Sequence, residues 1–176
     1  MTDYFELYQL PRSFNPDPAL VKAKYYELSR TWHPDRFSRA EGHEQAEALR
    51  MAALNNDVYK TLSDPDRLMA YLLKSHGLLE DEEKYNLPPA FLMEMMDLNE
   101  AVSDYEMQPD DANLARQSIT VLAEQFEAWE AGAKDLTDRF DAGDQSSDLL
   151  MKIKDMYFRK KYLLRIQERI NKFAAR

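Results

Sequence analysis

The chain has 176 residues, of which 44% are hydrophobic, so it is long enough to bury the core of one domain or of two small ones. It contains no cysteine, which excludes disulfides, thiolate metal sites and cysteine nucleophiles. The formal net charge of −9 argues against broad nucleic-acid binding.

Chain-wide patterns exclude several further classes. No apolar run is long enough to cross a membrane, and residues 1–4 do not begin a signal peptide, so we expect a soluble cytoplasmic protein that binds no membrane. No Gly-rich phosphate loop, activated nucleophile or acid–base pair can be assembled, so we expect no enzyme. The three histidines lack the spacing of a metal site, and we expect neither a metal nor another cofactor. Glycine is scarce and no alternating apolar pattern persists, which predicts an all-α fold.

The first two helices are predicted at residues 4–9 and from residue 18 to about residue 32. Asp17 can accept backbone N–H bonds at the start of the second helix, where Pro18 suits the first position. The apolar residues of this helix recur at steps of four, three and four, which places them on one face: Val21, Tyr25, Leu28 and Trp32.

The second helix has to end near residue 32. Pro34 disfavours the α conformation at His33 and has no N–H to continue the helical ladder. We therefore expect the polar turn His33-Pro34-Asp35 at the surface, with apolar packing behind it.

Two more helices are predicted before residue 78. The first runs from about Ala40 to Leu62 and packs antiparallel to the second helix, with the polar turn at the tip of the pair. Its seam is a three-four repeat of Ala48, Ala52, Asn55, Tyr59 and Leu62. A short helix then runs from Arg67 to His76, and Gly77 fits its C-terminal cap.

A charged stretch followed by Pro88-Pro89 marks a domain boundary. We predict an N-terminal domain over residues 1–77, a linker over 78–88 and a C-terminal domain over 89–176. Short connections between long amphipathic helices indicate that the last of these is an antiparallel three-helix bundle.

The helix predicted from Pro89 to about Glu106 has apolar residues on two sides. Phe91, Met95, Leu98, Val102 and Tyr105 already form a complete stripe, which we expect to be buried. Three further apolar residues point to the side, in the sector of three carboxylates, namely Leu92, Met93 and Met96 beside Asp97, Glu100 and Asp104. Such an arrangement indicates a docking face, and methionine adapts well to a partner. The alternative is a wide stripe covered by other helices of the same chain.

Charge is distributed unevenly along the C-terminal half. Acidic residues predominate over residues 81–104 and basic residues over 149–176. The simplest explanation is that an acidic helix lies beside a basic one. A partner-binding surface on the acidic helix is the other.

The order of helix, His-Pro-Asp turn and long charged helix over about residues 3–76 resembles a J-domain, the module that stimulates ATP hydrolysis by a seventy-kilodalton heat-shock chaperone. The resemblance implies that His33, Pro34 and Asp35 engage the chaperone ATPase. It also implies that basic residues around this turn assist, and here these are Lys22, Lys24, Arg30 and Arg36.

The segment from Ala90 to Glu100, placed after such a domain, is similar to the HscB family of iron–sulfur cluster co-chaperones. The resemblance implies two partners: a chaperone of HscA or DnaK type and an iron–sulfur cluster scaffold protein of IscU type. The implied scaffold-binding residues are Leu92, Met93, Met96, Asp97, Glu100 and Asp104, with Phe158 on the last helix. The absence of an N-terminal cysteine zinc motif favours a bacterial-type member.

Leu92, Met93, Met96 and Phe158 are accordingly expected to be at least partly exposed. Two other functions stay open. The protein can be a general folding co-chaperone whose bundle binds other clients or dimerises, or its N-terminal half can be purely structural.

Overall fold

The computed structural model describes residues 2–174, and every regular element within that range is a helix. The all-α prediction is therefore confirmed. None of the described helices is both long and apolar enough to cross a membrane. The elements are α1 (Tyr4–Tyr8), α2 (Pro18–Thr31), the 3-10 helix η1 (Pro34–Phe37), α3 (Gly42–Leu62), α4 (Pro65–Ser75), α5 (Pro89–Glu94), α6 (Met96–Met107), α7 (Ala112–Asp141) and α8 (Ser147–Ala174).

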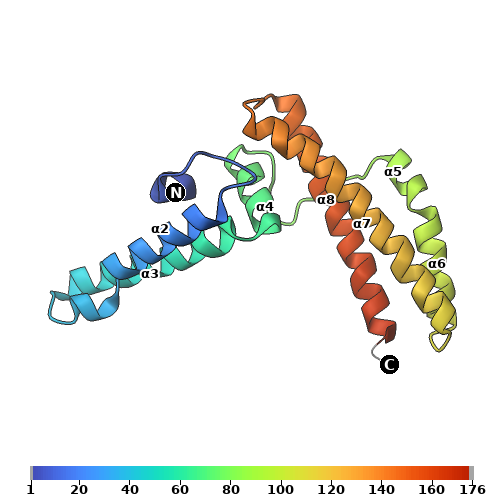
Figure 1. The fold of residues 1–176 in the computed structure, drawn as a ribbon, viewed down its shortest axis with the longest axis horizontal. Helices are drawn as coiled ribbons and strands as arrows, with labels where there is room; N and C mark the ends of the chain where they lie inside the picture. The colour runs from blue at the N-terminus through green and yellow to red at the C-terminus, as the bar shows by residue number, and fades with distance from the viewer. Residues whose placement is uncertain (1, 175–176) are drawn as a thin grey trace.

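The molecule has two arms that meet near α4 (Figure 1). One arm is the antiparallel pair α2–α3, with η1 at its far tip and α1 beside it. The other consists of α6, α7 and α8, which pack as a three-helix bundle. Both arrangements agree with the sequence analysis.

Local sequence explains where α2 begins and ends. The Asp17 carboxylate accepts a hydrogen bond from the Ala19 N–H at 2.8 Å, and Pro18 occupies the first helical position. At the other end, His33 has extended backbone angles before Pro34 and begins η1. The predicted helix stop is thus confirmed.

Asn55 is a buried polar residue in the seam between α2 and α3. Its amide nitrogen donates to the Tyr25 carbonyl and to Ser29 Oγ, both at 3.0 Å. Its amide oxygen accepts from Tyr8 Oη at 2.8 Å. Because every polar atom of this side chain has a partner, Asn55 joins α1, α2 and α3 without an unsatisfied group. Burial also raises the pKa of Tyr8 above its ordinary value.

The helix predicted from Pro89 to Glu106 is divided in the structure, which corrects that prediction. The interruption falls at Met95, between α5 and α6. The Met95 carbonyl accepts both the Asn99 backbone N–H, at 3.0 Å, and the Asn99 side-chain amide, at 2.8 Å. The helical bond to this carbonyl is therefore intact, and the side-chain bond adds to it. The same amide donates to Tyr162 Oη on α8 at 2.7 Å, which ties the first turn of α6 to the bundle.

The two arms share a continuous hydrophobic core. One cluster of buried side chains contains Leu72 and Leu73 of α4 together with Phe140 of α7 and Ile153 of α8. A polar contact reinforces it, since the Asp141 carboxylate accepts from the Phe14 N–H at 2.8 Å. The same carboxylate accepts from Ser13 Oγ and from the Asn15 backbone and side-chain N–H groups.

The segment predicted as a linker is packed against both arms. Leu79 is buried in the shared core, and Tyr85 Oη donates to Asp155 of α8 at 2.9 Å. Gly77 has a positive φ of 69°, as the predicted helix cap requires. The division into residues 1–77, 78–88 and 89–176 stays a prediction.

Candidate functional site

The His33-Pro34-Asp35 turn projects from the far tip of the α2–α3 pair. The side chains of His33 and Asp35 are 57% and 91% exposed. The His33 Nδ1 atom accepts a hydrogen bond from the Asp35 N–H at 3.3 Å, so a neutral ring carries its proton on Nε2. The turn therefore presents an imidazole N–H and a carboxylate to solvent from one short segment.

Packing behind the turn holds it in place. The rings of Trp32 and Phe37 stack with centroids 5.9 Å apart and an interplanar angle of 9°. Arg36 Nη1 donates to the Arg30 carbonyl at 3.1 Å, which ties the turn to the end of α2. The polar groups of the turn are thus exposed, while its backbone is supported by an aromatic stack and a hydrogen bond.

The structure brings only some of the predicted basic residues close to the turn. A shallow hollow at the tip is lined by His33, Arg30 and Arg36, together with Tyr26 and Ser29. Tyr26 is 52% exposed and lines the same hollow as Arg30 and Arg36. Neither Tyr26 nor Ser29 was assigned to the site from the sequence.

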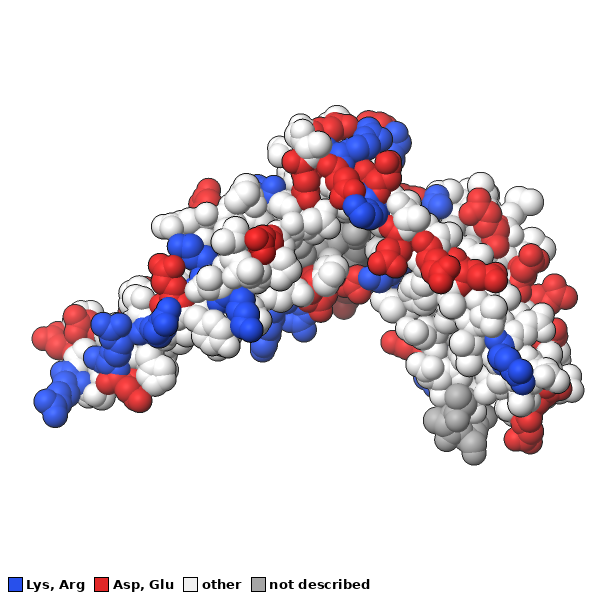
Figure 2. Space-filling model, in the orientation of Figure 1, with Lys and Arg blue, Asp and Glu red and all other residues white. Residues whose placement is uncertain are grey.

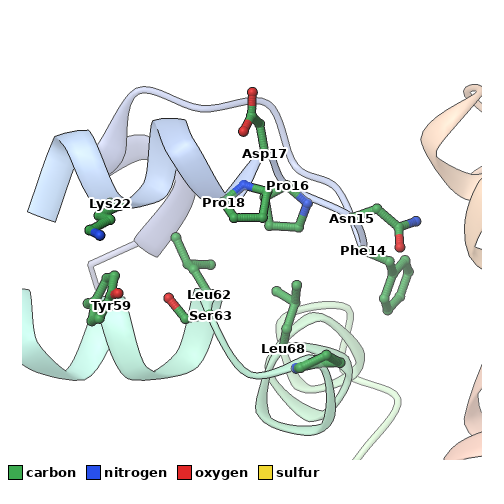
Figure 3. Close-up of a pocket in the computed structure, with 11 residues that line it drawn as sticks. Phe14, Asn15, Pro16, Asp17, Pro18, Lys22, Tyr59, Leu62, Ser63 and Leu68 are labelled. Atoms are coloured by element: carbon green, nitrogen blue, oxygen red, sulfur yellow. The ribbon is translucent and has the colours of Figure 1, made fainter.

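Lys22 and Lys24 lie nearer the other end of α2. Lys22 lies about 16 Å from His33 along the helix axis, because each residue advances a helix by about 1.5 Å. It lines a pocket between the start of α2, the end of α3 and the start of α4, and lies near Tyr59 (Figure 3). Lys24 is half-buried, donates to Gln9 Oε1 at 3.1 Å and pairs with Glu27. Lys22 is thus the more accessible of the two.

The second predicted surface lies on α5 and α6. Leu92, Met93 and Met96 are 43%, 70% and 63% exposed, as predicted. The opposite side of the same segment is buried, also as predicted, with Phe91, Met95, Leu98 and Val102 each at 5% exposure or less. We call the exposed group Leu92, Met93 and Met96 the apolar face. The alternative of one wide stripe covered by the chain's own helices is therefore wrong.

Carboxylates surround the apolar face. Asp97 and Glu100 are exposed and Asp104 is half-buried, and within residues 2–174 none of the three forms an ion pair. Acidic side chains also predominate over this arm on the side seen in Figure 2. As the sequence predicts, the acidic helix lies beside the basic one, since α6 packs on α8 and Glu106 pairs with Arg169. Glu83, in the segment before α5, pairs with Lys154 of α8.

Phe158 differs from its prediction, because it is only 9% exposed. The ring of Tyr85 stacks on it, with centroids 4.4 Å apart and planes 5° from parallel, and Tyr157 packs against its edge. Exposure is the prediction because Phe158 lies off the apolar stripe of α8. Its cover comes from Tyr85, in the segment 78–88 predicted as a linker, which packs against α8.

Tyr85 is the residue that sequence reasoning missed at this position. Burial, followed by the hydrogen bond to Asp155, raises its pKa to about 12. The available signal was an aromatic residue within an otherwise charged stretch, which a solvated linker has no reason to carry. Glu83, two residues earlier, accepts a hydrogen bond from Lys154 that lowers the pKa of its carboxyl.

A family model and a curated protein both match this chain. Residues 87–171 match the family model described as the HSCB C-terminal oligomerisation domain. A curated relative, the co-chaperone protein HscB homolog of Vibrio atlanticus, is 33% identical over 72% of this chain and 82% of its own length.

Two solved structures resemble the whole fold. Human co-chaperone protein HscB superimposes with a TM-score of 0.74 at 28% sequence identity, covering 97% of this chain and 81% of the human chain. Chaperone HscB from Vibrio cholerae gives a TM-score of 0.64 at 27% identity, covering 95% and 98% of the two chains. The likeness therefore extends over both arms.

Proposed function

Because this chain belongs to the HscB family of co-chaperones, we propose that it delivers an iron–sulfur cluster scaffold protein to a seventy-kilodalton heat-shock chaperone and stimulates that chaperone's ATPase. In this proposal the chaperone is of HscA or DnaK type, the scaffold is of IscU type, and the protein acts in the cytoplasm. Its own role is that of an adaptor, with no catalytic step.

The His33-Pro34-Asp35 turn is the proposed contact with the chaperone ATPase. Arg30 and Arg36 support this assignment, because they line the same hollow as His33 and form no ion pair with any described residue. Unpaired cations can attract an acidic surface and accelerate association. Lys22, and more weakly the partly engaged Lys24, extend this attraction along α2.

The apolar face is the proposed contact with the scaffold. Large apolar side chains are rarely left together on a surface unless something covers them, and methionine is common at adaptable interfaces. Asp97, Glu100 and Asp104 form a carboxylate rim that can select the partner and set its approach. Phe158 is proposed to act indirectly, as the support on which Tyr85 packs.

One observation carries this proposal. Leu92, Met93 and Met96 are exposed on the same helical segment whose other side is fully buried in the bundle. A helix that needed only to complete the bundle would carry polar residues at these positions. Exposed apolar residues beside unpaired carboxylates therefore indicate a specific protein-binding surface.

Affinity purification from the native cytoplasm tests the adaptor role. Tagged full-length protein should recover one folded scaffold protein and one heat-shock chaperone as its main partners. A heterogeneous mixture of unfolded clients would instead support a general folding co-chaperone. Recovery only of a second copy of this chain would support dimerisation through the bundle.

A further inference from the structure

A small groove lies between residues 83–87 and α8, on the side of the bundle where Tyr85 covers Phe158. Its floor is apolar and its rim is basic. The residues that line it are Glu83, Lys84, Tyr85, Leu87, Phe158, Lys161 and Arg165. We call it the strap groove, after the segment 83–87 that forms one wall.

The rim carries three positive charges that have no ion-pair partner within residues 2–174, at Lys84, Lys161 and Arg165. The acid in the groove does not compensate them, because Glu83 is already paired with Lys154 at 2.5 Å. The neighbouring bases of α8 behave differently. Arg159 pairs with Asp155 at 2.6 Å, and Lys160 pairs with Asp66 of α4.

The two bases that α8 contributes to the rim are close together. Lys161 and Arg165 are one helical turn apart, a spacing at which like charges destabilise a helix. A bound carboxylate would remove this repulsion.

Aromatic rings of α8, of which only Phe158 lines the groove, lie close to the two bases that α8 contributes to the rim. The Lys161 ammonium lies 5.4 Å from the Tyr157 ring centroid and 5.9 Å from that of Phe158. The Arg165 guanidinium lies 5.9 Å from the Tyr162 ring. Tyr85 directs its hydroxyl to Asp155, its ring stacks on Phe158, and the Lys154 ammonium lies 5.7 Å from its ring centroid. The remaining apolar surface of the groove comes from Leu87 and the uncovered part of the Tyr85 ring.

From this arrangement we propose that the strap groove binds an acidic segment of a partner polypeptide. The carboxylates of the segment would lie among Lys84, Lys161 and Arg165, and an apolar side chain would rest on Tyr85 and Leu87. Nucleic acid fits less well, because the chain is strongly acidic overall and phosphate backbones require a longer basic surface. The groove shares Phe158 with the proposed scaffold-binding residues, but its basic rim is separate from the apolar face on α5 and α6. Peptide binding at the rim can therefore be absent while the apolar face still binds the scaffold.

Fluorescence anisotropy tests the proposal with a short fluorescein-labelled peptide of alternating glutamate and leucine. We expect the full-length protein to bind this peptide, with an affinity that falls as salt rises. The double variant K161E/R165E should weaken binding at least tenfold. The matched control R116E/K172E changes the net charge equally at two exposed bases of the bundle and should bind as wild type does.

Any of three results would overturn the proposal. These are no binding at millimolar protein, binding that K161E/R165E leaves unaffected, and binding that is unchanged when glutamine replaces glutamate in the peptide. Tighter binding of a short oligothymidylate at the same groove would indicate nucleic acid instead. Amide chemical-shift changes confined to α2 and η1 would place the peptide on the chaperone-binding side. Thermal melts of both variants establish that each is folded. If K161E/R165E is unfolded, the milder variant K161Q/R165Q replaces it in the binding measurement.

Discussion

The His33-Pro34-Asp35 turn and the apolar face are both exposed, but the chain holds them in opposite ways. The turn consists of polar groups at the tip of an arm, and its support comes from Trp32 and Phe37 behind it. The apolar face lies one residue away from the core positions Phe91 and Met95 on the same helical segment. A substitution in the turn can therefore change the contact with the chaperone without changing stability. A substitution on α5 or α6 changes either partner binding or core packing, because docking and core residues are neighbours in sequence.

The largest expected effect concerns the turn. D35N or H33Q should abolish ATPase stimulation, because the exposed carboxylate or imidazole no longer meets the chaperone. The melting temperature should stay close to that of wild type, since neither side chain is buried. Steady-state ATP hydrolysis by the purified chaperone measures the first quantity and circular dichroism the second. H43Q is the matched control, since His43 is an exposed histidine on α3 and should leave stimulation intact.

Phe158 gives the next largest effect, and it concerns stability. F158A should lower the free energy of unfolding by about 3 kcal/mol, because a buried ring is removed and the stacked Tyr85 loses its support. M93A on the apolar face should change it by less than about 0.5 kcal/mol. Urea denaturation measures both. Equal and small changes would mean that Phe158 is exposed in solution and belongs to the docking surface directly.

The apolar face gives an effect on binding. L92A/M96A should weaken scaffold binding at least tenfold, which corresponds to about 1.4 kcal/mol, while the melting temperature changes little. L49A/M151A, an exposed leucine and methionine elsewhere, should bind normally. L98A removes a fully buried side chain and should cost about 2–5 kcal/mol of stability. Titration calorimetry beside thermal melts separates these cases. Early unfolding of L92A/M96A would mean that the apolar face is core.

The smallest effect concerns alkaline pH. The pKa of Tyr85 is raised to about 12 in the folded protein, from an ordinary value of 10.0. The folded state therefore holds this proton more tightly, so the stabilisation is present below pH 10 and is lost as pH rises from 10 to 12. Y85F should reduce this loss of stability relative to wild type while keeping the ring stack. An identical alkaline slope in both proteins would contradict the raised pKa of Tyr85.

Much of the fold could be predicted, because apolar periodicity and helix caps are local signals. The stripe of Val21, the stop at Pro34 and the cap at Gly77 each depend on residues close in sequence. The interruption at Met95 could not be predicted in the same way, because no glycine or proline in the sequence marks it. The bond from Asn99 to Tyr162, which ties the start of α6 to α8, likewise forms only through tertiary packing.

At the candidate site, too, local features could be predicted from the sequence and tertiary contacts could not. Exposure of Leu92, Met93 and Met96 follows from helix geometry once the buried stripe is known, and it was predicted correctly. Exposure of Phe158 was predicted wrongly, because its cover comes from Tyr85, far away in the chain. Periodicity within one helix says which residues leave its main stripe, but it does not say what a loop places on top of them.

In the proposed division of labour, the turn stimulates the chaperone while the apolar face brings the scaffold to it. The decisive experiment measures steady-state ATPase activity of the purified chaperone with wild type and with L92A/M96A, each with and without scaffold protein. We predict that both proteins stimulate equally without scaffold and that only wild type gains further stimulation when scaffold is added. If a folded L92A/M96A gains as much from the scaffold as wild type does, the apolar face is not the scaffold contact.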